Sequence, residues 1–320
     1  MKRVLALLVI APAMFAQVLT NTSRGVVAAH DGRVELVGGW NVAGVRHATS
    51  IVAGNAQVAV LDALDNAVVI VDLASGRVTR HETAETPIDA AFVGRELYVL
   101  CRDSQVVQKF PTLGPPASAP AVALMRATST DVYLYSRLTG TLERLGGARV
   151  RVAPFASDFE IAGNTAYLVF PREARIRTVD LRTMKPTGEI SVGAVPVDLA
   201  FAGGGTALTA RVLAVADPSA KRVWLTEGTQ STAQAIARGF LRGFLGLGLF
   251  GARSSQFPTG VDRVLAQGKN WIAYDTSSGT LYRFTKNASR VLAKGITANA
   301  FTVTEDGVAY WQDGRVRIAR

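Results

Sequence analysis

One short pattern recurs along most of this chain. In its clearest copies an aspartate opens an apolar run that ends at a glycine five residues later, and a second apolar run follows. Looser copies change the opening residue or lengthen the gap. The seven opening positions are Thr49, Asp89, Leu124, Asp158, Asp198, Asp262 and Asn299. Recurrence at such a period is the signature of a repeat architecture, in which each unit packs against its neighbours.

The spacing of the units predicts a β-propeller. Successive opening positions are 40, 35, 34, 40, 64 and 37 residues apart, and a propeller blade occupies roughly 40–50 residues. Thirty glycines separate short valine-rich runs, a composition that favours many strands and tight turns. The expectation is an all-β propeller of about seven four-stranded blades. A β-sandwich or two small barrels are the alternatives, although their strands need no such internal register.

Two segments depart from the regular spacing. Only the 64-residue interval is anomalous, and an insertion at residues 231–256 restores it to 38. The last unit has 21 residues after its opening position, enough for three strands. Residues 33–38 are therefore expected to supply its fourth strand, so that both ends of the chain share one blade and no sheet edge is left exposed. The single propeller domain is predicted over residues 22–320.

The N-terminus has the layout of a secretory signal. Lys2 and Arg3 precede an apolar run at residues 4–10, and residues 11–13 supply a small-x-small cleavage pattern, with a second candidate site three residues later. We predict a signal peptide at residues 1–16 and an exported protein, periplasmic or associated with the cell envelope. A buried N-terminal strand is the alternative. The run is too short to cross a bilayer core of about 30 Å, so no transmembrane helix is expected in the mature chain.

The net charge limits which partners the chain is expected to bind, and the cysteine content limits its covalent cross-links. The formal net charge is +10, and the basic residues are scattered rather than gathered in runs of five or six, so no nucleic-acid partner is expected. An anionic surface or an acidic protein fits a basic exported chain better. Cys101 is the only cysteine, which excludes an intramolecular disulfide. Its apolar neighbours place it on a buried strand.

Two parts of the repeat resemble a known family. The run Ala-Val-Val-Ile-Val-Asp-Leu at residues 67–73, and Val-Asp-Leu at 179–181 with Ile-Ser-Val-Gly-Ala-Val-Pro at 190–196, resemble the YVTN-type bacterial propellers. That WD40-like group is similar to the β-chain of quinoprotein amine dehydrogenase. The resemblance covers most of residues 45–320 and implies a fold more than a function, because such repeats serve binding proteins, lyases and electron-transfer subunits alike. The terminal asparagine of the name-giving motif is missing here.

The opening positions are also the first candidate site. Equivalent residues of successive blades form a ring around the channel of a propeller, so the candidate residues are Asp89, Asp158, Asp198, Asp262 and Asn299. Like charges held close together raise one another's pKa or recruit a cation. Ligation by oxygen alone suits Ca²⁺ or Mg²⁺. The alternative is structural: each aspartate accepts backbone hydrogen bonds in a turn or ties one blade to the next.

The insertion supplies a second candidate site. Gln234, Arg238 and Arg242 recur at four-residue spacing, with apolar residues opposite them, which predicts an amphipathic helix. Such a helix fits an anionic membrane surface or the groove of a protein partner. The candidate docking residues are Arg238, Phe240, Leu241, Arg242 and Phe244. Folding back over the propeller's own face is the alternative.

Recognised catalytic motifs are absent from the sequence. It contains no G-x-S-x-G elbow, no H-E-x-x-H and no P-loop, and His30, His47 and His81 are interpreted as turn or solvated residues. We expect a binding or scaffold protein, rather than an enzyme, that presents its channel face and insertion to a partner. The rivals are a divalent-cation-dependent enzyme or dehydrogenase-type subunit that uses the aspartate ring, and a purely structural envelope protein.

Overall fold

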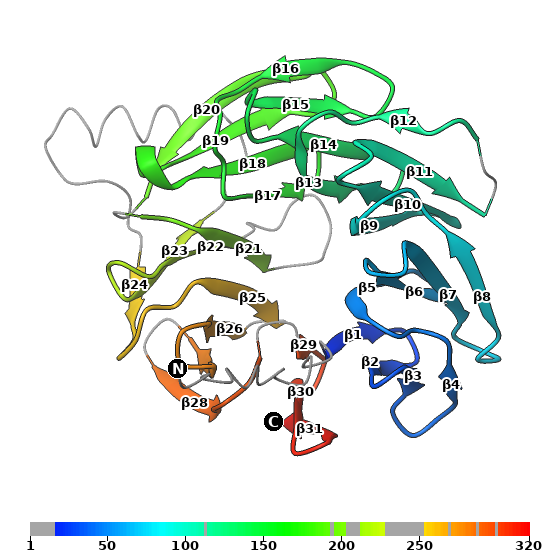
Figure 1. Ribbon diagram of the computed structural model, residues 1–320. Helices are drawn as coiled ribbons and strands as arrows, with labels where there is room; N and C mark the ends of the chain where they lie inside the picture. The colour runs from blue at the N-terminus through cyan, green and yellow to red at the C-terminus, as the bar shows by residue number, and fades with distance from the viewer. Residues whose placement is uncertain are drawn as a thin grey trace, which may run out of the picture.

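Eight β-sheets stand around a central channel like the blades of a propeller (Figure 1). The computed structural model describes residues 17–111, 114–192, 195–202, 212–227, 253–267, 270–285, 288–297 and 300–320. Within each blade the strands follow sequence order from the channel outward, and neighbouring strands are antiparallel. The chain is therefore a closed series of meanders.

The strands of the first four blades are β1 (Val18–Thr22), β2 (Gly25–His30), β3 (Arg33–Leu36) and β4 (Asn41–Ala43); β5 (Ala48–Ala53), β6 (Gln57–Asp62), β7 (Ala67–Asp72) and β8 (Val78–Glu82); β9 (Pro87–Val93), β10 (Glu96–Cys101), β11 (Val106–Phe110) and β12 (Ala117–Ser118); β13 (Val122–Ala127), β14 (Val132–Ser136), β15 (Thr141–Arg144) and β16 (Arg149–Arg151).

The last four blades contain β17 (Asp158–Ala162), β18 (Thr165–Phe170), β19 (Arg175–Asp180) and β20 (Lys185–Ser191); β21 (Asp198–Ala202), β22 (Val212–Asp217), β23 (Arg222–Glu227) and β24 (Arg253–Gln256); β25 (Arg263–Gln267), β26 (Asn270–Asp275), β27 (Thr280–Phe284) and β28 (Ser289–Ala293); β29 (Phe301–Val303), β30 (Val308–Gln312) and β31 (Arg315–Ala319). Between β18 and β19 lies a single 3₁₀ turn, η1 (Pro171–Glu173).

Middle strands explain the valine-rich runs of the sequence. In β6 the side chains of Val58 and Val60 pack toward blade one, whereas Ala59 and Leu61 pack toward blade three. Because another blade covers each face of the sheet, both sets of alternating side chains are apolar. Burying one such valine contributes about 1.5–3 kcal/mol relative to leaving it exposed.

The core lies between the blades. Seven clusters of buried apolar residues join neighbouring sheets, and the largest of them joins blades seven, eight and one. In that cluster Trp311 and Tyr310 of β30 pack with Leu19 of β1 and Tyr274 of β26. The innermost strands contact one another in order around the ring, and β29 contacts β1. Side-chain packing between the last blade and the first therefore closes the ring.

The expected number of blades was wrong. All seven predicted units are present, with their inner strands at β5, β9, β13, β17, β21, β25 and β29, but β1–β4 form an eighth blade. Strand β3 pairs with β2 and β4 inside that blade, so residues 33–38 do not complete the last one and the expected shared blade does not exist. The sequence hid the first blade because β1 begins at Val18 without a polar opening residue, directly behind the signal-like segment.

The predicted helical insertion is corrected as well. The described residues contain no α-helix, and no helix long and apolar enough to span a membrane. Residues 253–256, assigned to the insertion, form β24, which pairs with β23 as the outer strand of blade six. Residues 228–252 lie outside the described residues, and with them the candidate docking residues Arg238, Phe240, Leu241, Arg242 and Phe244.

The prediction that Cys101 is a buried strand residue is confirmed. It ends β10, is inaccessible to solvent and packs in the cluster between blades two and three. Burial raises the pKa of its thiol to about 11, so the thiolate that reacts with oxidants and electrophiles is scarce at neutral pH.

Two glycines of blade four differ in how closely the neighbouring backbone approaches them. Both have positive φ, but a Cβ at Gly140 would lie 2.3 Å from the carbonyl carbon of Ala153, whereas a Cβ at Gly146 would meet nothing within 4 Å. Gly146→Ala should cost about 1–2 kcal/mol for the left-handed backbone alone. Gly140→Ala should cost about 1–3 kcal/mol more for the clash. Urea unfolding of the two variants measures the difference, and equal losses would contradict it.

Candidate binding site at the channel mouth

Three of the predicted aspartates lie where the sequence placed them, near the start of inner strands. Asp158 and Asp198 are the first residues of β17 and β21, and Asp89 is the third residue of β9. Because every blade begins with its inner strand running in the same direction, these positions share one end of the channel. We call this end the channel mouth.

Each of these aspartates also ties its blade to the next. Asp89 Oδ2 accepts a hydrogen bond from the backbone N–H of Met125 at 3.3 Å, and Asp198 Oδ2 accepts one from the N–H of Val264 at 2.7 Å. Asp158 accepts one from the N–H of Leu199. In all three cases the donor belongs to the inner strand of the following blade. The aspartates therefore have the structural role of linking blades, and these hydrogen bonds hold their side chains in fixed positions.

Arg126 of β13 occupies the centre of this group. Its Nη2 lies 2.8 Å from Asp158 Oδ1, its Nε lies 2.9 Å from Glu160 Oε1, and its Nη1 lies 3.8 Å from Asp89 Oδ2. One guanidinium in blade four thus joins carboxylates of blades three and five. The guanidinium also lies over the ring of Phe159, 5.6 Å from its centroid.

Sequence analysis missed Arg126 and Glu160, although both are visible in the repeat. Each stands two residues after an opening position, Leu124 or Asp158, and period-two alternation along a strand puts it on the same face as that position. A charged residue two positions after the opening residue of an inner strand could have identified both of them as members of the site. Neither residue recurs in other units, so a search for recurrence passed over them.

Burial sets the protonation of the cluster. It raises the pKa values of the three carboxyl groups around Arg126, and the charge of the guanidinium offsets only part of that rise. Burial, and then the charge of Asp158, raise the pKa of Asp198 well above its ordinary value, and the two carboxyl groups share a hydrogen bond. Burial alone would lower the pKa of Arg126, but the surrounding carboxylates outweigh it and raise that pKa. The guanidinium stays charged, and Asp198 is the carboxyl group of the cluster that most favours its protonated form.

The cluster is open to the channel. Side chains of Glu160, Asp89 and Arg126 keep 36%, 30% and 29% of their accessible surface, whereas Asp158 keeps 11%. A small charged group that enters the channel mouth can therefore reach Glu160 and Asp89 directly, while Asp158 stays behind Arg126.

Other predicted ring positions do not join the cluster. Asp262 precedes β25, and its carboxylate accepts hydrogen bonds from the N–H and hydroxyl of Thr276 in its own blade. The hydroxyl of Thr49 donates to the carbonyl of Leu61, and Leu124 packs against the core between blades four and five. Asn299 lies outside the described residues.

Comparison with known proteins defines the fold class. No protein-family model matches the chain, and no curated protein matches it. The dihydro-heme d1 dehydrogenase NirN, solved in complex with DHE, aligns with a TM-score of 0.67 and 11% identity over 96% of this chain and 71% of that one. The computationally designed protein Ika8 aligns with a TM-score of 0.64 and 12% identity over 95% and 99%.

A chain of the mitotic checkpoint complex also aligns, with a TM-score of 0.53 and 10% identity over 96% of this chain and 87% of that one. Identities this low establish the fold alone, which is that of a β-propeller. They support the propeller part of the resemblance noted in the sequence and leave the YVTN-type and quinoprotein relationship without support.

The raised pKa of Asp198 has a measurable consequence. A carboxyl group whose pKa is higher in the folded state than in the unfolded chain stabilises the fold at low pH, and this contribution is lost as the pH rises through the folded-state pKa. An asparagine can still accept the Val264 N–H and can donate to Asp158. Asp198→Asn should therefore raise the midpoint of thermal unfolding by a few degrees at pH 7–8, and the gain should vanish toward pH 4.

Asp217 serves as the matched control. Burial alone would raise its pKa, but hydrogen bonds from Ser219 and Ala220 outweigh burial and lower it. Its contribution is present above the unfolded-state pKa and is lost as the pH falls, so Asp217→Asn should destabilise the protein at pH 7 and have less effect at pH 4. Thermal unfolding of both variants is measured between pH 4 and 8. If their unfolding midpoints changed with pH in the same way, the raised pKa of Asp198 and the lowered pKa of Asp217 would both be refuted as the cause.

Proposed function

We propose that this chain is an exported binding propeller, of the periplasm or cell envelope, whose channel mouth receives a positively charged group of a protein partner. One observation carries the proposal: at one end of the channel three carboxyl groups converge on Arg126, and a fourth, that of Asp198, shares a hydrogen bond with Asp158. These carboxyl groups outnumber the guanidinium groups near them, those of Arg126 and of Arg263 beside Asp198, so negative charge is in excess there. The chain as a whole has a formal net charge of +10.

An acidic cluster of this kind acts strongly on a cationic ligand. The walls of the channel have a low dielectric constant, which focuses the field of the carboxylates toward the opening. The blade-to-blade hydrogen bonds hold these carboxylates in place before a ligand arrives, so little conformational entropy is lost on binding. A lysine or arginine side chain of a partner is the ligand that matches the charge of such a site.

The comparisons establish the fold alone and include both kinds of protein. One similar chain belongs to the mitotic checkpoint complex, an assembly of proteins, and another is a dehydrogenase. Catalysis by a channel-mouth ring with Ca²⁺ or Mg²⁺ is the alternative. In the described residues Arg126 already occupies the centre of the cluster, which favours an organic cation at its rim over a metal ion at its centre.

Removing the two reachable carboxylates tests the channel mouth. Asp89→Asn with Glu160→Gln leaves Asp158 to pair with Arg126, so the fold should hold while the excess negative charge falls. Binding of a tetralysine peptide, measured by isothermal titration calorimetry at low salt, should weaken about tenfold in this double variant. The matched control, Glu82→Gln with Glu305→Gln, changes the net charge equally at exposed positions and should bind as the wild type does.

The same titration separates the alternatives. Wild-type protein that ignores the peptide, or binds it no better than the channel-mouth variant does, refutes the proposed site. Saturable binding of Ca²⁺ or Mg²⁺ that the double variant abolishes, without peptide binding, supports the cation-dependent enzyme instead. Raising the salt concentration should weaken peptide binding, because the attraction is electrostatic.

Export is tested separately. The protein recovered from the periplasmic fraction of a Gram-negative host should have an intact mass that begins at Met14 or Gln17, the residues after the two cleavage candidates. Recovery of the uncut chain from the cytosol would argue instead for the N-terminal strand.

A further inference from the structure

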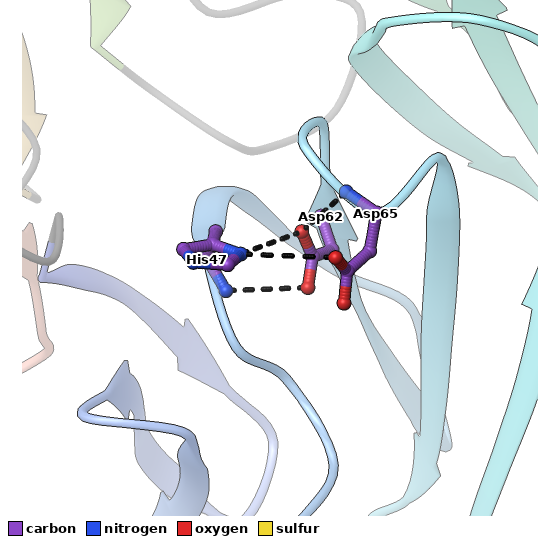
Figure 2. Close-up of side chains that lie close together, drawn as sticks. All are labelled: His47, Asp62 and Asp65. Carbon is purple, nitrogen blue, oxygen red and sulfur yellow. Dashed lines mark hydrogen bonds and ion pairs between the residues drawn. The ribbon is translucent and has the colours of Figure 1, made fainter.

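His47 brings a nitrogen ligand to two carboxylates at the rim of blade two. His47 directly precedes β5, Asp62 ends β6, and Asp65 lies in the turn that leads to β7 (Figure 2). His47 Nδ1 lies 3.7 Å from Asp62 Oδ1 and 4.0 Å from Asp65 Oδ1. These ligand atoms all lie within 4.8 Å of one another. The group is separate from the channel-mouth cluster, whose residues belong to blades three to six.

The other blades provide an internal reference for this turn. Asp62, Asp217 and Asp275 each end the second strand of their blade and pair with the first residue of the third. In blade seven the turn hydroxyls of Ser277 and Ser278 donate to Asp275 at 2.6 and 2.5 Å. Hydroxyl donors therefore satisfy the carboxylate where the turn has only a structural role.

Blade two departs from that arrangement at two positions. Asp65 stands at the turn position of Ser278, so a second carboxylate replaces a hydroxyl donor. The residue before the inner strand is His47, where blade seven has Asp262 bonded to Thr276. Two carboxylates held close together repel each other, and a cation between them relieves this repulsion. His47 adds an imidazole nitrogen to the same gap.

The geometry points to a divalent transition-metal ion bound by His47, Asp62 and Asp65. One nitrogen and two oxygen ligands suit Zn²⁺ and its first-row neighbours better than Ca²⁺ or Mg²⁺, which prefer oxygen alone. With metal–ligand bonds of about 2.0–2.2 Å, ligand atoms in a tetrahedral site lie roughly 3.3–3.6 Å apart. The observed distances from His47 Nδ1 to the two carboxylate oxygens, 3.7 and 4.0 Å, are a few tenths of an ångström longer than this range.

The surroundings of the three ligands suit such a site. Asp62 is completely buried, and its Oδ2 accepts the backbone N–H groups of Arg46 and His47 at 3.1 and 3.2 Å. Its Oδ1, which faces the imidazole, accepts the backbone N–H of Asp65 at 3.1 Å and keeps a further lone pair for an ion. Arg80 lies 3.4 Å from Asp65 Oδ2 and so engages the carboxylate oxygen that faces away from the ion. The side chains of His47 and Asp65 are 33% and 28% exposed. Solvent or a partner's ligand can therefore complete the coordination.

A single substitution separates a metal site from a turn. Asp65→Ser rebuilds in blade two the hydroxyl donor of blade seven, so it should keep the turn folded while removing one ligand. Zinc at a hundredfold excess over its dissociation constant should raise the thermal unfolding midpoint of the wild type by about 5 °C. This rise should disappear in Asp65→Ser and in His47→Ala, and isothermal titration should give one ion per wild-type chain.

His81→Ala is the matched control, because the His81 ring packs against Phe110 of β11 in blade three and is not one of the three ligands. It should keep the full response to zinc. Co²⁺ added to the wild type should give the visible absorption of a coordinated ion, and the Asp65→Ser protein should not. A wild-type melting point that zinc leaves unchanged overturns the site, as does an equal rise in wild type and Asp65→Ser. Peptide binding at the channel mouth is independent of either result.

Discussion

Packing of every blade on both of its faces is the constraint from which the rest of this structure follows. A sheet covered on one side can alternate apolar and polar residues, but β6 and β7 are apolar on both faces apart from polar residues at their ends. Polar groups are therefore displaced to strand ends and turns, where backbone donors are available. The aspartates that open inner strands and those that close second strands are the products of this displacement.

Both candidate sites grow out of these structural aspartates. At the channel mouth Asp89, Asp158 and Asp198 first join blades, and Arg126 and Glu160 then convert the same positions into a charged cluster. At the rim of blade two, Asp62 first holds a turn, and Asp65 and His47 then convert it into a set of ligands. In each case an aspartate that recurs among the blades holds the backbone rigid. Residues that occur in one blade alone then add the charged groups or ligand atoms that could bind a partner or an ion.

This division explains how far sequence reasoning reached. Repetition located seven inner strands, because residues with the same structural duty recur at the same register. It missed the first blade, whose opening residue is Val18, and it predicted one blade too few for that reason. It also missed Arg126, Glu160 and the proximity of His47 to two carboxylates, because each of these residues occurs once and meets its partners only in the folded chain. His47 lies 15 and 18 residues from Asp62 and Asp65, a spacing that no local motif connects.

Closure of the ring through β29 and β1 gives the protein a thermodynamic property that open arrays lack. In a linear solenoid a terminal unit can detach by giving up one interface, so unfolding starts as fraying at an end. Here each blade, including the first and the last, packs against two others. Detaching any of them exposes two apolar faces at once and strips one apolar face of each neighbour, which makes partial unfolding costly and the transition cooperative around the whole ring.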